Sequence, residues 1–190
     1  MIIKTKGKTM EENNINEELE EKNKIEEKQE IDKEMAISKV KENGKSLEFL
    51  PYEMQDDKDV VMEAISQDGE ALEFASDRLK DDKEIVMKAI SKAAWTAYYA
   101  SERLKADKEV IMASVTTYGQ TLYYASEELR DDEEVVKAAI SNKGLIIKYA
   151  SFRLRDNKEL AEIAVKQNKE AYHFLSARLK QDEEIKGLLN

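Results

Sequence analysis

The acidic pairs are the first residues of this sequence whose types and spacing could do chemistry. Two carboxylates stand side by side at Asp56–Asp57, Asp81–Asp82 and Asp131–Asp132. Such pairs could bind calcium or act as a general acid and a general base. However, neighbouring side chains diverge on a helix, and the glycine and ligand spacing of a calcium-binding loop is missing. We therefore interpret the pairs as N-caps, whose carboxylates accept hydrogen bonds from the free amides of a first helical turn.

His173 is the only histidine, and the chain has no cysteine. No serine, cysteine or second histidine accompanies His173 in a pattern that would form a catalytic triad or a metal site. Nothing in the sequence resembles a phosphate-binding loop. The sequence therefore predicts no catalytic residue, no cofactor and no metal, and we expect a protein that is not an enzyme.

Five residues form a candidate binding site. Trp95 lies three residues before Tyr98, so both side chains project from the same side of a helix. Tyr123, Lys148 and His173 follow Tyr98 at successive intervals of 25 residues, so stacked repeats would align them in a ladder. Tyrosine and tryptophan combine a large, stiff surface with a polar group, and they are enriched at binding hot spots. We predict that the aromatics anchor a partner and that Lys148 and His173 form a polar margin.

A second interpretation of the same aromatics remains open. Trp95 and its neighbours could fill irregular gaps beside Ala93 and Ala94, where small residues interrupt the pattern of the repeat. The next aromatic column, which includes Phe74, Tyr99 and Tyr124, is predicted to belong to the core.

The elements that must position these side chains follow from an internal repeat, because the chain aligns with itself at an offset of 25 residues without an insertion. Six units cover residues 32 to 181, and a seventh begins after them. The columns hold an acid or amide at Asp32, Asp57, Asp82, Asp107, Asp132, Asn157 and Asp182, an aromatic at Phe49, Phe74, Tyr99, Tyr124, Tyr149 and Phe174, and a leucine at Leu79, Leu104, Leu129, Leu154 and Leu179.

Each unit reads as two helices. In DKDVVMEAISQDGEALEFASDRLKD, Val60, Val61, Ala64 and Ile65 form an apolar stripe at helical spacing. Asp56 or Asp57 caps this helix, and acids three residues after the first acid of other pairs, such as Glu84 after Asp81, predict capping boxes.

Glycine is predicted to end this helix in the left-handed conformation, at Gly44, Gly69, Gly119 and Gly144. Ala94 and Lys169 break the glycine column, so those two helix ends should be less sharply defined. The stretch EALEFAS predicts a second, shorter helix. A serine column at Ser76, Ser101, Ser126, Ser151 and Ser176, with Pro51 in the first unit, marks a helix start and a short turn to the next unit.

One such unit buries too little apolar surface to fold alone, so neighbouring units must complete its core. The sequence predicts an all-α fold, an α-solenoid of six tandem 25-residue helical hairpins and a partial seventh. We assign residues 31–190 to this repeat domain, which ends in a short helix carrying Leu188 and Leu189. Residues 1–30, rich in Glu, Lys and Asn, are predicted to be a disordered or frayed helical tail.

The columns also carry a resemblance to a known family. The pattern A-L-x-Y/F-A-S-x-x-L-R-D-D-K-E-V-V-x-x-A-I is similar to a tandem-repeat family of uncharacterised proteins, domain of unknown function 4116. The resemblance covers residues 32 to 190 and is most specific in the units that begin at Asp57, Asp82 and Asp132. It implies a helical repeat protein and implies no activity.

Composition limits the partners. The net charge of −10 disfavours nucleic acid and anionic membranes, because both require a basic surface. No apolar run approaches the roughly 20 residues that span a bilayer, and no secretory signal is present, so we expect a cytoplasmic protein.

We expect a non-catalytic interaction scaffold that binds a protein or peptide with a basic or mixed surface. The alternative hypothesis is structural self-association through imperfectly capped ends, for which the stop after Leu188 and Leu189 is the clue. An enzyme with an unrecognised site is the third and least favoured hypothesis.

Overall fold

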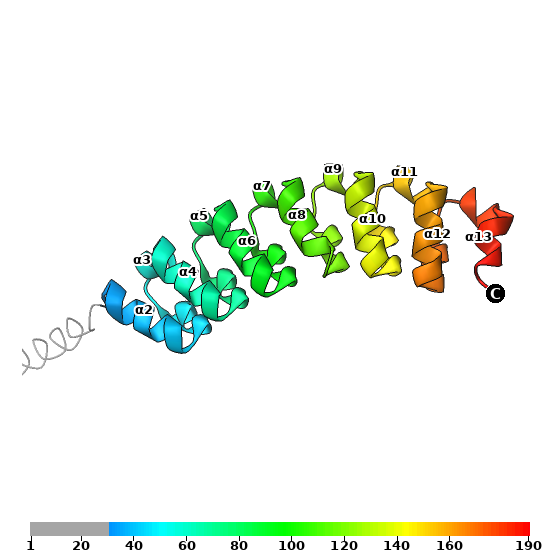
Figure 1. Cartoon of the computed structure of the whole chain (residues 1–190). Helices are drawn as coiled ribbons and strands as arrows, with labels where there is room; N and C mark the ends of the chain where they lie inside the picture. Colours follow the sequence, from blue (N-terminus) through cyan, green and yellow to red (C-terminus); the bar gives the residue numbers. More distant parts are fainter. Residues whose placement is uncertain (1–30) are drawn as a thin grey trace, which may run out of the picture. The chain divides into compact units, whose positions relative to one another are not determined.

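The computed structural model describes residues 31–190, and the prediction for residues 1–30 lies outside the described residues. Residues Lys33–Asn190 form one compact unit. This unit is an all-α solenoid in which the predicted repeats follow one another in a single row (Figure 1). The described residues contain no strand.

The first element of each unit is a long α-helix that follows an acidic or amide N-cap. The apolar stripe of each helix is buried, as Val60, Val61, Ala64 and Ile65 show in the second unit. The long helices are α2 (Lys33–Glu42), α4 (Lys58–Gln67), α6 (Lys83–Lys92), α8 (Lys108–Val115), α10 (Glu133–Asn142) and α12 (Lys158–Gln167).

The second element is a 3₁₀-helix. With three residues per turn, positions i, i+3 and i+6 of such a helix form one row. Gly69, Leu72 and Ala75 occupy this row in the second unit, and all three are buried. The 3₁₀-helices are η1 (Gly44–Phe49), η2 (Gly69–Phe74), η3 (Ala94–Tyr99), η4 (Gly119–Tyr123), η5 (Gly144–Tyr149) and η6 (Lys169–Phe174).

A single helical turn then leads to the next unit. The serine column begins this turn, as predicted; for example, the Ser101 hydroxyl accepts a hydrogen bond from the Leu104 amide at 3.2 Å. The one-turn helices are α3 (Tyr52–Gln55), α5 (Asp77–Lys80), α7 (Glu102–Lys105), α9 (Glu127–Arg130), α11 (Phe152–Arg155) and η7 (Leu179–Gln181), and α13 (Glu183–Gly187) ends the row.

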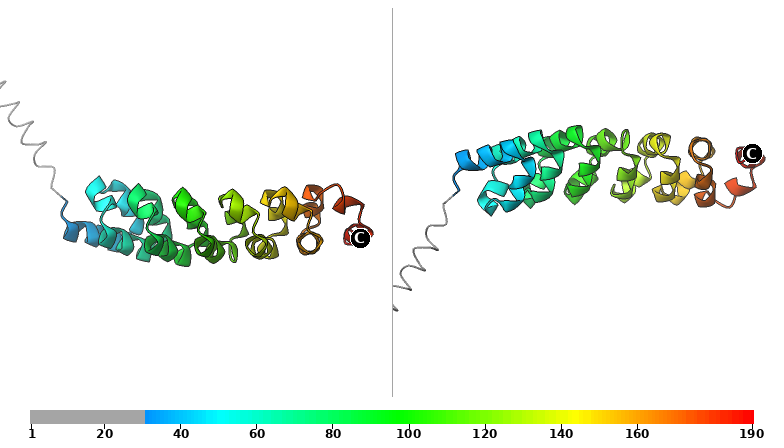
Figure 2. Two further views of the ribbon diagram at one scale, coloured as in Figure 1. Left: turned by 90° about the horizontal axis from the view of Figure 1, so that it is seen from above. Right: turned by 90° about the horizontal axis from the view of Figure 1, so that it is seen from below.

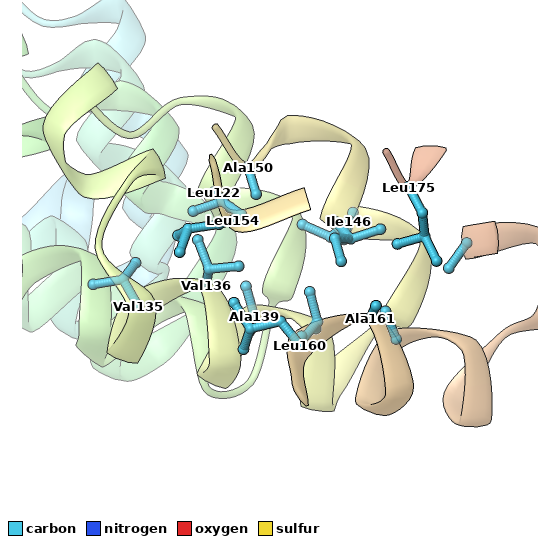
Figure 3. Packing of buried hydrophobic residues seen from close by; sticks show 14 of the residues in the cluster. Leu122, Val135, Val136, Ala139, Ile146, Ala150, Leu154, Leu160, Ala161 and Leu175 are labelled. Atoms are coloured by element: carbon cyan, nitrogen blue, oxygen red, sulfur yellow. The ribbon is translucent and has the colours of Figure 1, made fainter. Parts of the chain in front are cut away.

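Two rows of helices enclose the core. The long helices form one row and the 3₁₀-helices the other (Figure 2). From α4 onward, each long helix packs against the 3₁₀-helices of its own and the preceding unit. Figure 3 shows the result for three consecutive units, where Leu122, Leu154 and Leu160 converge on one cluster. Of the described helices, none is both long and apolar enough to cross a membrane.

The two carboxylates of each acidic pair accept hydrogen bonds from different units, which corrects the predicted capping boxes. The second acid is the N-cap: the Asp82 carboxylate accepts hydrogen bonds from the amides of Glu84 and Ile85 at 3.0 and 3.4 Å. The first acid, Asp81, instead accepts hydrogen bonds from the next unit, from the Ser101 hydroxyl and from the Arg103 Nε. The pairs are therefore junctions between repeats, and capping explains only half of them.

The same junction recurs four times, with the arginine Nε 2.9–3.1 Å from the aspartate. It involves Asp56–Ser76–Arg78, Asp81–Ser101–Arg103, Asp131–Ser151–Arg153 and Asp156–Ser176–Arg178. Between the third and fourth units the aspartate is Ala106 and the arginine is Glu128. Both charged partners of this one junction are absent together.

We expect that the double substitution A106D/E128R raises the melting temperature. It would supply the aspartate and arginine that the other four junctions share around their serine, here Ser126. A106D alone should not raise it, because the new carboxylate would face Glu128. Thermal melts followed by circular dichroism on the two single variants and the double variant test this, and additive effects would contradict it.

We also expect the repeat domain to lose stability in acid. Hydrogen bonds from Ser101 and Arg103 lower the pKa of Asp81 below its ordinary value of 3.8, and Asp56, Asp131 and Asp156 behave alike. A carboxylate whose pKa is lower in the folded chain stabilises that chain above about pH 4, and the stabilisation disappears as the pH falls through the folded pKa. D81N should therefore melt at a lower temperature than the wild type near neutral pH, and its melting temperature should fall less when the pH is lowered. Equal falls in the two proteins would show that Asp81 does not cause the loss of stability in acid.

The glycines do not end the long helices in the left-handed conformation, because none of the described glycines has a positive φ. The four glycines of this column are required because a side chain there would collide with the next unit. A Cβ atom on Gly119 would lie 2.6 Å from the Ala139 carbonyl oxygen of the next unit. The prediction for the exceptions is also wrong: the helices before Ala94 and Lys169, α6 and α12, are full-length.

Candidate functional site

The aromatic ladder is the candidate site, and we use this name for Tyr98, Tyr99, Tyr123, Tyr124 and Tyr149. These residues end the 3₁₀-helices η3, η4 and η5 or directly follow them. The neighbouring 3₁₀-helices pack side by side, so equivalent residues of consecutive units meet. On η3, η4 and η5 a row of small and aliphatic residues covers the core, and the two tyrosine columns lie beside this row, at the surface. The row consists of Ala97 and Ala100, Leu122 and Ala125, and Ile147 and Ala150.

The rings of the ladder alternate between the two columns. The ring centroids of Tyr98 and Tyr124 are 4.8 Å apart, and those of Tyr123 and Tyr149 are also 4.8 Å apart, across the junctions between units. Within each unit, Tyr98 lies 5.1 Å from Tyr99 and Tyr123 lies 4.9 Å from Tyr124. All four pairs are tilted or edge-on, arrangements that contribute about 0.5–1.5 kcal/mol each beyond burial. The ladder is therefore continuous over three units.

Polar and aromatic side chains fix the two ends of the ladder. At one end, Trp95 packs on Tyr99 with a centroid distance of 5.6 Å. The Tyr99 hydroxyl donates to the Glu73 carboxylate at 2.8 Å. Burial and this carboxylate raise the pKa of Tyr99 well above its ordinary range.

At the other end, a lysine takes the place of a tyrosine. The Lys148 ammonium lies 4.7 Å from the ring centroid of Tyr149 and 6.0 Å from that of Phe174. This geometry is a cation–π contact, worth roughly 0.5–1 kcal/mol at an exposed site. Lys148 thus continues the row of the ladder into the sixth unit.

The second aromatic column is not core, which corrects the prediction for Phe74, Tyr99 and Tyr124. These three are half-buried, and Phe49 at the first position of the column is 79% exposed. The prediction assumed an α-helix, whose buried face would include this position. In the 3₁₀-helix Gly69, Leu72 and Ala75 form one buried row, and Phe74 lies in the adjacent row, where Ala71 is buried and Phe74 itself is only half-buried.

The structure brings four of the five predicted site residues to the ladder. Tyr98 and Tyr123 are exposed at 48% and 54%, Trp95 is half-buried against Tyr99, and Lys148 packs on Tyr149. His173 is exposed and makes none of the ladder's ring contacts. Its ring contacts Tyr172, which is outside the ladder, and its Nε2 is 3.7 Å from the Glu170 carboxylate.

Sequence reasoning did not assign the inner members of the ladder, or the cations beside it, to the binding site. Tyr99, Tyr124 and Tyr149 had been assigned to the core. The basic column just after the invariant leucine also borders the ladder: the Lys105 ammonium lies 5.7 Å from the Tyr98 ring centroid. The signal was present in the sequence, because this column keeps a cation at Lys80, Lys105, Arg130, Arg155 and Lys180.

Two hollows flank Tyr149. One, lined by Tyr118, Gln120, Tyr123, Tyr124 and Tyr149, lies between the rings. The other contains Arg130 and Arg155. Within residues 31–190, no group of three or more histidine or acidic side chains is placed to hold a metal ion.

The chain matches one family model. The model is described as a domain of unknown function, DUF4116, and it matches residues 32–80, 57–105, 82–130 and 107–155. These four segments overlap, and each begins one 25-residue unit after the previous one. No curated protein matches the chain significantly, and no solved structure does.

Proposed function

Because the chain belongs to the DUF4116 family of tandem helical repeats, which carries no assigned activity, we propose a function from the geometry: a non-catalytic scaffold that binds a protein or peptide along the aromatic ladder. The observation that carries the proposal is the exposure of aromatic side chains in a continuous row. Tyr98 and Tyr123 present about half of their surface to solvent although each already contacts two other rings.

The packing of the ladder supports recognition of an extended segment. Rings held by neighbouring rings lose little conformational freedom when a partner binds, so more of the contact energy is retained as affinity. The 25-residue period sets an even spacing of contacts along the row. An extended peptide can place alternate side chains against such a row, whereas a small molecule would use only one step of it.

The alternative interpretation, that the aromatics only fill gaps, accounts for part of the geometry. Trp95 is half-buried beside Ala94, and it has a packing role on Tyr99. Gap filling does not require the exposure of Tyr98 and Tyr123, since a shorter side chain would cover the same inner rings.

We expect peptides selected from a random library on the intact protein to depend on the ladder. The triple substitution W95S/Y98S/Y123S should weaken their binding by about 100-fold, since hot-spot aromatics contribute about 2 kcal/mol or more each and their effects are not additive. Isothermal titration measures the affinity, and circular dichroism verifies that the variant is folded. F49S/Y52S, which removes two exposed aromatics of the first unit, is the matched control. Unchanged binding by the triple variant would contradict the proposal.

Self-association remains the alternative hypothesis. Leu188 and Leu189, on which it rested, are half-buried and pack against the last core cluster. Light scattering over a concentration series separates the two hypotheses, because a monomer at high concentration is incompatible with self-assembly.

A further inference from the structure

The six arginines of the chain fall into two groups. Arg78, Arg103, Arg153 and Arg178 each donate hydrogen bonds to an aspartate carboxylate and to the backbone carbonyl of the same aspartate. Arg130 and Arg155 do not share this arrangement. Their Nε atoms are buried and have no hydrogen-bond partner within the described residues.

Among the described residues, neither of these two guanidinium groups donates a hydrogen bond to a carboxylate. The Arg130 Nη2 lies 3.7 Å from the Glu127 carboxylate, beyond hydrogen-bond distance, and that carboxylate is 91% exposed. The Arg155 guanidinium lies 5.9 Å from the ring centroid of Phe152, a cation–π contact. The inner part of each side chain is therefore buried, while its charged end can still bind an anion.

Both arginines line the same hollow. Its volume is about 440 Å³, and its other lining residues are Glu127, Asp131, Tyr149, Ala150, Ser151 and Phe152. The junction of two units builds it, since the Ser151 amide donates to the Arg130 carbonyl at 2.9 Å. Tyr149 belongs to the aromatic ladder, so the hollow opens directly beside the ladder.

The acids near the hollow leave it a net positive character. Asp131 is already engaged, because Ser151 and Arg153 both donate to its carboxylate. Glu127 is the only other acid in the lining. Lys105 and Lys148 also lie beside the ladder, and the Lys105 ammonium is paired with the Glu102 carboxylate at 3.0 Å. With Asp131 offset by Arg153, the lining leaves Arg130 and Arg155 against Glu127 alone, so the sign of the local charge is opposite to that of the net charge of the chain.

From this arrangement we infer that the Arg130–Arg155 hollow binds a carboxylate side chain of the peptide that occupies the ladder, so that the partner is an acidic segment interspersed with aromatic or apolar residues. The inference rests on the proposed function, and it replaces the basic or mixed partner surface expected from the net charge of the chain with an acidic one. Guanidinium groups match the geometry of a carboxylate, and a partly desolvated guanidinium attracts an anion more strongly than one in water. Phe152 and Tyr149 supply apolar walls for the neighbouring side chain.

The test uses a fluorescein-labelled peptide of alternating glutamate and phenylalanine, and fluorescence anisotropy with the full chain. We expect it to bind more tightly than the peptide of alternating lysine and phenylalanine. R130Q/R155Q should weaken binding of the glutamate peptide at least about tenfold, in the range for loss of charge-assisted hydrogen bonds. K41Q/K92Q removes two exposed positive charges from the ends of α2 and α6 and should change the affinity less than about twofold.

A second variant, E127Q, is expected to increase the affinity for the glutamate peptide. E127Q removes the carboxylate that lies 3.7 Å from the Arg130 Nη2, so it should tighten binding of the glutamate peptide, by about two- to fivefold. Equal or tighter binding of the lysine peptide, no binding of the glutamate peptide, or equal losses in R130Q/R155Q and K41Q/K92Q would each overturn the inference. If library-selected peptides need the ladder but tolerate R130Q/R155Q, the proposed function stands and the carboxylate site does not.

Discussion

Replacing Gly119 by alanine is expected to destabilise the repeat domain by about 1–3 kcal/mol, the range for overpacking a close contact. The added Cβ atom would lie 2.6 Å from the Ala139 carbonyl oxygen and 3.2 Å from the Asn142 Oδ1. The first of these is a backbone atom of α10, so it cannot move unless the helix of the next unit moves. The Gly119 amide also donates to Asn142 at 3.0 Å, and this bond would lengthen with the same shift.

Gly187 provides the matched control. It ends α13, and a Cβ atom built there would meet nothing within 4 Å. G187A should therefore leave the free energy of unfolding within about 0.5 kcal/mol of the wild type. Urea unfolding followed by circular dichroism measures both variants, and equal effects at the two glycines would contradict the close approach.

The chain contains a natural version of this experiment. Alanine stands at position 94, and the helix that faces it, α8, ends at Val115, after eight residues instead of ten. Within α8, the Ser114 hydroxyl donates to the Ala94 carbonyl at 2.7 Å. At Lys169, the Nζ donates to the carbonyls of Leu189 and Asn190 at 2.7 and 2.8 Å, where the other units have a long helix. The irregularity thus appears in the following unit and not in the preceding helix, where the break in the glycine column predicts it.

Replacing Leu154 by alanine is expected to cost about 2–5 kcal/mol, the range for a buried leucine that leaves a cavity. Leu154 is completely buried, and it joins the cluster built by Leu122 and Leu160 of the neighbouring units (Figure 3). A void there would remove contacts in three consecutive units. The loss should appear as a lower midpoint of urea unfolding.

Phe152 lies in the same one-turn helix and is 71% exposed. F152A should change the free energy of unfolding by less than about 0.5 kcal/mol, because little surface is buried there. It should nevertheless weaken binding of the glutamate and phenylalanine peptide, because Phe152 lines the arginine hollow. If F152A destabilised the domain as much as L154A, Phe152 would be a packing residue.

Much of the fold could be predicted because the repeat makes each column visible several times. The spacing of Val60, Val61, Ala64 and Ile65 is that of an α-helix, and the serine column has one conformational role that proline shares. The type of the second helix could not be predicted, since EALEFAS is compatible with both periods. That difference of 3.0 against 3.6 residues per turn changes which residues share a row with Leu72, and the sequence left Phe74 in the buried stripe of an α-helix.

The candidate site could likewise be predicted only in part. Tyr98 and Tyr123 stood out because polar residues precede them in their column, whereas Tyr99 and Tyr124 were hidden in an invariant aromatic column. The pairing of Asp81 with Ser101 and Arg103 crosses a junction between units, which no local motif reports. Arg130 and Arg155 can be distinguished only in the structure, where the guanidinium groups of the other four arginines are hydrogen-bonded to aspartates.

The most direct measurement for the central claim is photo-crosslinking of a library-selected peptide that carries a benzophenone group, with the attachment points mapped by mass spectrometry. The ladder predicts attachment within residues 95–99, 118–124 and 148–155, and the same peptide should not label W95S/Y98S/Y123S efficiently. Attachment confined to the outer faces of α4, α6 and α10 would contradict the ladder as the binding face.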